Sequence, residues 1–187
     1  MKPQQARNGL LRIVAIIAAG SLASLAATLG VAAPADAYTL TGCHWPATAI
    51  QINYQNVPAG NYVTAINAAA GNYYSNTDAK VTTTLASGPS FTAKAGNYGA
   101  DGYEGYTNWV CPFGSTTSAD ARLNSYYLSG APVARLKVVW LHEIGHGLGL
   151  NHVSGTGYVM YSSASVAYNN GVRSLTFDEV AGINSLY

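Results

Sequence analysis

The amino-acid sequence predicts an α+β fold: a twisted mixed β-sheet with an N-terminal helix, a second helix that carries two histidines, and a closing C-terminal helix. Alternating apolar and polar residues, the period of half-buried strands, predict the sheet. Apolar residues at three- and four-residue spacing predict the two longer helices. A capping pattern near the C-terminus predicts the third. Because no repeat or long linker interrupts these elements, we expect a single domain.

Four segments are predicted to form strands. Ile50–Tyr54 alternates between apolar and polar residues. Val81–Leu85 and Phe91–Ala95 show the same alternation on either side of a turn at Ser87-Gly88-Pro89. Tyr106–Val110 follows a stretch rich in Gly, Asn, Asp and Tyr. Strands of this length, separated by a helix and turns, indicate a mixed sheet.

The first predicted helix follows Pro58, and its apolar stripe consists of Tyr62, Ile66, Ala69 and Tyr73. Gly71 weakens its far end, because glycine is a poor helix former. The second helix runs to about Leu148 from Pro132, a residue that suits the first helical position.

The closing helix begins near Thr176, which forms a capping-box pattern with Glu179. Asp178 and Glu179 also place negative charge at the positive end of the helix dipole. The last part of the chain is therefore expected to end in a short, well-capped helix.

The composition excludes several classes of protein. Hydrophobic residues make up 49% of the 187 residues and charged residues only 9%, with nine Lys and Arg against eight Asp and Glu. Nucleic-acid binders need clustered basic residues, and disordered tails need like-charge blocks or low hydrophobicity. We therefore expect neither a nucleic-acid partner nor a disordered chain.

The N-terminus has the organisation of a secretory signal peptide. Three basic residues precede an uncharged, Ala-rich run from Ile13 to Ala33, and Ala35-Asp36-Ala37 is a small-x-small cleavage site. We expect residues 1–37 to be removed, which leaves 38–187 as the mature domain, secreted and with no stable membrane partner. A retained transmembrane anchor is the alternative, since the run is long enough to span a bilayer.

Cys43 and Cys111 are the two cysteines. In an oxidising compartment an even pair favours a disulfide that ties the N-terminal segment to the middle of the chain. The alternative is lipidation, because Leu40-Thr41-Gly42-Cys43 resembles a bacterial lipoprotein box. Pro34, Asp36 and Tyr38 separate this box from the apolar run, which favours the disulfide.

The second helix contains His142-Glu143-Ile144-Gly145-His146, an H-E-x-x-H pattern. Four residues advance a helix by about 6 Å and about 40 degrees, so both imidazoles project toward one ion, as zinc requires. His152 extends the pattern to H-E-x-x-H-x-x-G-x-x-H, and Gly149 supplies the turn that brings it back. A bare H-E-x-x-H occurs by chance, but this longer match with Met160 eight residues later predicts a single zinc site.

One further candidate ligand group carries a weaker signal than the histidines. Asp101 and Glu104 lie in a Gly-rich segment and form a possible calcium loop, although such acids are more often simply solvated. His44, the fourth histidine, lies next to Cys43 and Trp45 and is expected to be structural or exposed.

The motif resembles the metzincin clan of zinc endopeptidases, and within it the matrixin family. The step from His152 to Met160, the Tyr161 that follows, and the C-terminal stretch 175–187 are all similar to matrixins. The resemblance implies a zincin fold with an upper subdomain, 38–149, and a small lower subdomain, 150–187, that ends in a helix.

The resemblance also implies roles for individual residues. His142, His146 and His152 would bind zinc, Glu143 would act as general base toward a zinc-activated water, and Met160 would underlie the metal. The expected activity is hydrolysis of peptide bonds by a secreted metalloendopeptidase.

Substrate residues are implied less directly. In the family, an extended peptide pairs with an edge strand, for which Tyr106–Val110 is the candidate. The loop 161–174 would form the outer wall of the pocket, with Tyr161 and Tyr168 as candidate wall residues.

Departures from the family shape the expectation. The sequence shows no cysteine-containing propeptide of the matrixin type and none of the extra histidines that hold structural zinc. We therefore expect a compact, secreted, bacterial relative rather than an animal tissue-remodelling enzyme. We also expect the protein to be a monomer. The alternatives are a non-catalytic, zinc-stabilised homologue or binding module, and an aminopeptidase or other zinc amidase. Glu143 favours an enzyme, because a non-catalytic homologue has no need of a general base.

Overall fold

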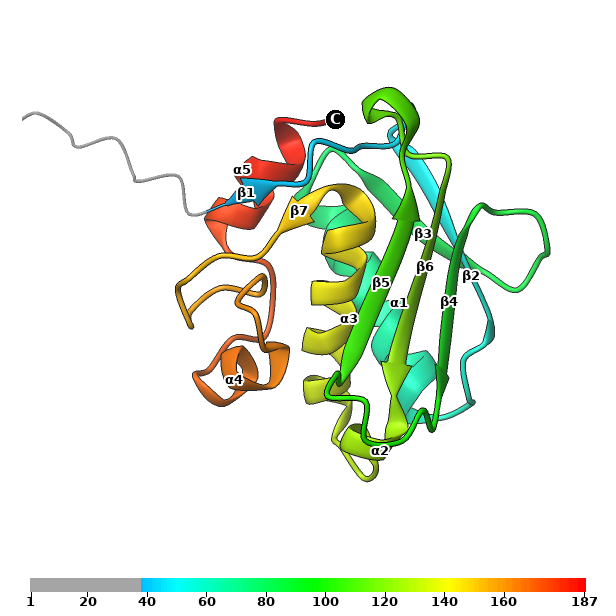
Figure 1. The fold of residues 1–187 in the computed structure, drawn as a ribbon, viewed down its shortest axis with the longest axis vertical. Helices are drawn as coiled ribbons and strands as arrows, with labels where there is room; N and C mark the ends of the chain where they lie inside the picture. The colour runs from blue at the N-terminus through cyan, green and yellow to red at the C-terminus, as the bar shows by residue number, and fades with distance from the viewer. Residues whose placement is uncertain (1–37) are drawn as a thin grey trace, which may run out of the picture. The chain divides into compact units, whose positions relative to one another are not determined.

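A computed structural model describes residues 38–187, in which a five-stranded mixed sheet packs against two long helices (Figure 1). The strand order is β3-β2-β4-β6-β5, with every neighbouring pair parallel except β5 and β6. The strands are β2 (Ala49–Asn56), β3 (Lys80–Thr84), β4 (Phe91–Gly96), β5 (Gly105–Val110) and β6 (Ser118–Asn124). The predicted signal peptide, 1–37, lies outside the described residues. The edge position of β5 matches the expectation from sequence.

Two long helices, α1 (Asn61–Asn76) and α3 (Val133–Leu148), pack against each other and against the sheet. The sheet buries alternate residues, such as Ile50 and Ile52 of β2, while Gln51 between them is exposed. Both predicted helices are confirmed, with two local differences. The first continues past Gly71 to Asn76, and Pro132 is the residue before the second helix rather than its first residue.

Helix α3 is the most deeply buried element of the domain. Its core side chains Leu136, Trp140 and Ile144 have no exposed surface, and the Tyr73 hydroxyl of α1 donates to the Leu141 carbonyl at 2.7 Å. The backbone of α3 is therefore fixed by its packing, and so are the positions from which its accessible side chains project.

The remaining elements lie around the ends of α3. Strand β1 (Thr39–Leu40) pairs antiparallel with β7 (Leu150–Asn151), and α5 (Phe177–Asn184) lies beside them (Figure 1). The short helices are a 3-10 turn (Pro112–Gly114), α2 (Ser125–Leu128) and α4 (Ala164–Asn169). Within the part of the chain that is described, no helix has the length and apolar character needed to cross a membrane.

A disulfide joins Cys43 to Cys111, with their Cα atoms 5.9 Å apart. The predicted pairing is confirmed, and it leaves the Cys43 sulfur without a free valence for the thioether of a lipid. The bridge closes a separation of 68 residues, which restricts the unfolded chain and so stabilises the fold.

Sequence patterns missed or misplaced some elements. Leu85, expected in a strand, lies just beyond β3 with 58% of its surface exposed. Strand β6 was not predicted, although it occupies the position between β4 and β5. The closing helix begins as predicted after Thr176, whose backbone N–H and hydroxyl both donate to Glu179 Oε2, at 2.8 and 2.9 Å.

Candidate metal centre and active site

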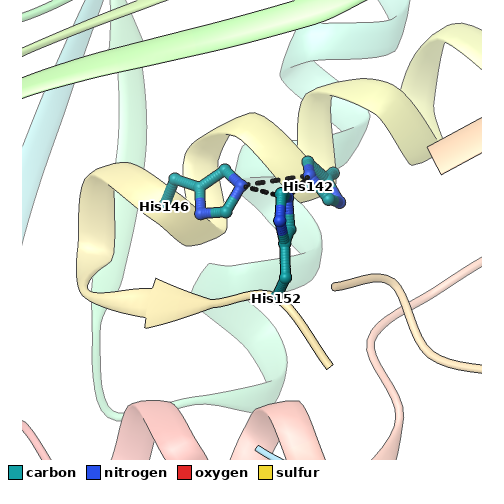
Figure 2. Close-up of side chains that lie close together, drawn as sticks. All are labelled: His142, His146 and His152. Atoms are coloured by element: carbon teal, nitrogen blue, oxygen red, sulfur yellow. Dashed lines mark hydrogen bonds between the residues drawn. The ribbon is translucent and has the colours of Figure 1, made fainter. Parts of the chain in front are cut away.

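The H-E-x-x-H segment occupies the last two turns of α3. His142 and His146 are one turn apart on this helix and project toward the same point (Figure 2). His142 is buried, with 4% of its surface exposed, whereas His146 is partly accessible. The helix thus supplies two imidazoles side by side, as their spacing predicts.

Gly149 ends the helix and turns the chain back. Its φ of +114° is in the left-handed region that glycine adopts most easily. A Cβ at this position would lie 2.2 Å from the Cys43 carbonyl oxygen, so no larger residue fits. The two-residue strand β7 follows and delivers His152 to the other two histidines (Figure 2).

The three Nε2 atoms form a small triangle. They lie 3.1 Å apart between His142 and His146, 3.2 Å between His142 and His152, and 3.1 Å between His146 and His152. Tetrahedral zinc with Zn–N bonds of about 2.0 to 2.1 Å requires separations of about 3.3 Å. The donor set and its geometry therefore fit a zinc ion with one open position.

Backbone carbonyls orient two of the rings. Nδ1 of His142 lies 2.8 Å from the Val159 oxygen, and Nδ1 of His146 lies 2.9 Å from the Leu150 oxygen. A carbonyl only accepts, so each Nδ1 carries the proton and each Nε2 presents its lone pair toward the shared point. Such outer hydrogen bonds are typical of metal-binding histidines.

The electrostatics keep these imidazoles neutral. Burial, reinforced by the neighbouring His146, lowers the pKa of His142 to about 3. Burial also lowers the pKa of His146 to about 4 and shifts the pKa of His152 in the same direction. Neutral imidazole is the form that binds a metal, so the site is prepared for a cation at neutral pH.

Glu143 lies beside this triangle, with 4% of its surface exposed. Its Oε2 accepts a hydrogen bond from the Thr107 hydroxyl of β5 at 2.6 Å. Burial raises the pKa of Glu143 to about 8, and the Thr107 hydrogen bond opposes that shift. A carboxyl group whose pKa lies near neutrality is suited to accept and return a proton.

Comparison with known proteins bears on this geometry. The family model described as Matrixin matches residues 48–187. The chain belongs to the matrixin family. Its mixed sheet and helices have the α+β fold expected of matrixins, and membership supports zinc metalloendopeptidase activity in general.

Two curated relatives match over a short segment. One, named as a candidate matrix metalloproteinase of Spodoptera frugiperda ascovirus 1a, is 48% identical over 48 residues, which is 25% of this chain and 12% of the relative. The other, matrilysin of Mus musculus, is 50% identical over 46 residues, or 25% of this chain and 17% of its own length. The matches therefore span only a small part of these relatives.

Met160, the methionine that the matrixin motif predicts, is buried, with 1% of its surface exposed. Its backbone N–H donates to Glu179 Oε1 at 3.0 Å, and its sulfur lies close to α3, because a Cβ on Gly145 would be 2.6 Å from Met160 Sδ. Glu179, predicted only as part of a helix cap, therefore links α5 to the backbone at Met160. The capping pattern indicated the residue but not its second partner.

A groove of about 660 Å³ runs along the metal centre. Its walls come from β5, α3 and the loop after Met160, through Ser162, Ser163 and Ala164. Neither Tyr161 nor Tyr168 lines it, and the Tyr168 ring instead stacks against Arg173. The loop thus forms a wall, but not through the two tyrosines named from sequence.

Trp109 of β5 is a groove residue that the sequence did not single out. Its ring stacks over His146, with centroids 6.2 Å apart and an interplanar angle of 18°. Thr107 was also missed, because a lone threonine in a strand carries no motif.

The possible calcium loop finds no support. Asp101 binds Arg122 and Asn124, each at 2.9 Å, while Glu104 accepts from the Ser165 backbone N–H at 2.7 Å. In residues 38–187 the three histidines are the one group of side chains arranged to hold a metal. The two acids instead brace neighbouring segments through protein partners.

His44 lies outside the metal centre. It is exposed, and its ring meets the edge of Tyr187 with centroids 6.3 Å apart. Its carbonyl oxygen accepts from Thr116 N at 2.7 Å. The residue therefore has local structural contacts and no metal-binding partners.

Proposed function

We propose that the protein is a secreted, monomeric, zinc-dependent endopeptidase. The observation that carries the proposal is the convergence of three neutral imidazoles beside a buried carboxylate in an open groove. Secretion rests on the signal-like segment 1–37 and on the disulfide, which suits an oxidising compartment.

His142, His146 and His152 would hold the metal. Zinc held there would supply Lewis-acid chemistry, which activates a water and polarises the scissile carbonyl. Glu143 takes the proton of the attacking water at a carboxylate oxygen and then passes it to the departing amine, whose C–N bond breaks as the tetrahedral species collapses. The groove would bind the peptide in extended form along the free edge of β5, through backbone hydrogen bonds.

The first experiment compares the wild type with Glu143→Ala. We expect both proteins to bind one zinc ion, while Glu143→Ala loses casein cleavage by several orders of magnitude. Equal cleavage by both would assign the proton transfer to another group. A wild-type protein that binds zinc but cleaves nothing would favour the alternative, a non-catalytic homologue or binding module.

Two further measurements define the reaction and the mature chain. Cleavage of a peptide blocked at both ends, with fragments mapped by mass spectrometry, distinguishes an endopeptidase from an aminopeptidase. Intact mass of the exported protein should show an N-terminus at Tyr38, and a retained segment 1–37 would contradict secretion by cleavage.

A further inference from the structure

Thr107 is the one buried residue of β5, and its hydroxyl faces the helix that carries the histidines. The Oγ1 atom lies 2.6 Å from Glu143 Oε2 and 3.0 Å from the Glu143 carbonyl oxygen. A hydroxyl has one proton to donate, and the shorter contact to a carboxylate is the stronger of the two. When Glu143 is ionised, as a general base must be, Thr107 therefore donates to its side chain.

The same strand also touches the other carboxylate oxygen. A Cβ built on Gly105 would lie 2.3 Å from Glu143 Oε1. Gly105 is not among the glycines with positive φ, so a larger residue here would displace the Glu143 side chain rather than strain the backbone. Both carboxylate oxygens of Glu143 therefore lie against strand β5. Thr107 binds Oε2, and Gly105 leaves room for Oε1.

We propose that Thr107 is a positioning residue that fixes the orientation of the Glu143 carboxylate. The proposal rests on the function proposed above. A glutamate side chain has three rotatable bonds, and a general base must lie about 2.6 to 3.2 Å from the proton it removes. Because the hydroxyl holds Oε2, it determines where Oε1 lies. A displacement of about 1 Å in a catalytic group costs on the order of a hundredfold in rate.

Two substitutions separate positioning from packing. Thr107→Val keeps the shape of the side chain and removes the hydroxyl, whereas Thr107→Ser keeps the hydroxyl. For the zinc-loaded enzyme we expect Thr107→Val to lower kcat about tenfold to a hundredfold, with KM changed less than about twofold. Thr107→Ser should remain within about threefold of wild type. A purely structural role would instead lower zinc content or melting temperature.

Thr92 provides a control with the same chemistry. Its hydroxyl on β4 donates to Asp120 Oδ1 at 2.8 Å, away from the groove. Thr92→Val therefore removes a strand hydroxyl bonded to a carboxylate without touching Glu143, and its kcat should equal that of wild type.

Crystal structures of the zinc-loaded wild type and Thr107→Val supply a readout that does not depend on activity. We expect one Glu143 conformer bonded to Thr107 in the wild type and a displaced or multiple conformer in the variant. Wild-type kcat in Thr107→Val, or a Glu143 carboxylate that stays in place, would overturn the proposal. If the wild type cleaves no peptide, the proposed function fails, while the Glu143 conformer still decides the positioning role.

Discussion

The candidate metal centre is built in two halves that differ in how their histidines are held. His142 and His146 project from α3, where helix geometry fixes their spacing and a buried core supports them. His152 is exposed and follows a turn and a two-residue strand. The first half is determined by residues within one helical turn, whereas the second depends on contacts from distant parts of the chain.

Those distant contacts come mainly from the first residues of the described chain. The Thr39 hydroxyl donates to the His152 carbonyl at 2.6 Å, and the Thr41 backbone N–H donates to the Gly149 carbonyl at 2.8 Å. Strand β1 thereby stabilises the turn that presents the third histidine. A local motif can specify the helical half, but the turn half requires most of the fold.

The largest effect is expected from removing a ligand in either half. His146→Ala and His152→Ala should each weaken zinc binding by about a thousandfold, because each removes one of three protein ligands. Chelator competition measures the affinities, and His44→Ala, a histidine outside the centre, serves as the control.

The two variants should differ once the metal is removed. His152 is exposed, so His152→Ala should leave the melting temperature of the metal-free protein within a few degrees of wild type. His146→Ala removes the hydrogen bond to the Leu150 carbonyl and the stacking with Trp109. It should therefore lower the melting temperature of the metal-free protein more than His152→Ala does. Equal melting temperatures would show that His146 and His152 contribute equally to the stability of the metal-free protein.

The next effect concerns the segment that follows His152 and contains Met160. Glu179 is buried and accepts hydrogen bonds from Met160 and Thr176. Glu179→Ala leaves these donors without a partner and should lower the free energy of unfolding by about 3 kcal/mol, measured by urea denaturation. Glu179→Gln keeps an acceptor oxygen and should cost less. Because both Glu179 oxygens accept hydrogen bonds, the amide nitrogen of Gln must face one of the donors, and a loss as large in Glu179→Gln would show that both acceptor oxygens are required.

The stability of the metal-free protein should also depend on pH, mainly through His142, Glu143 and His146 of the helical half. Below pH 6.5 the unfolded chain protonates His142 and His146, whose folded pKa values are about 3 and about 4. Between pH 4.5 and 8 the folded chain instead keeps a proton on Glu143. From pH 5 to 6 the unfolded state therefore binds about one proton more, and stability should rise by about 1.4 kcal/mol per pH unit.

Above pH 6.5 the two states differ mainly in the protonation of Glu143. This difference changes stability in the opposite direction to the histidines. The folded state now holds the extra proton, so stability should fall toward pH 8 and the maximum should lie near pH 6.5. Denaturation at several pH values tests this profile. Glu143→Gln should remove the alkaline decline, and a decline that persists in this variant would point to a different group.

The same division explains what the sequence could predict. The pair on α3 follows from helical periodicity, and Gly149 follows from the need for a left-handed turn. Strand β6 escaped prediction because its buried positions include the small residues Ala119 and Ala121, which give a weak alternating signal.

Contacts between residues far apart in the chain could not be predicted in this way. Thr107 meets Glu143 across 36 residues, and Glu179 meets Met160 across 19. No local pattern encodes either meeting, because both depend on how β5 and α5 are placed by the rest of the fold. Family resemblance supplied the identity of the motif residues, but not these supporting partners.

The smallest effect is expected at the Met160 side chain. This residue is held by its backbone N–H, while its side chain packs against α3 at Gly145 and carries no hydrogen bond that orients a histidine. Met160→Leu conserves volume and should cost less than about 1.5 kcal/mol, with zinc affinity unchanged. Chelator competition and urea denaturation of the same samples measure both quantities. A large loss of zinc affinity without loss of stability would contradict the packing role and show that the sulfur itself influences the metal.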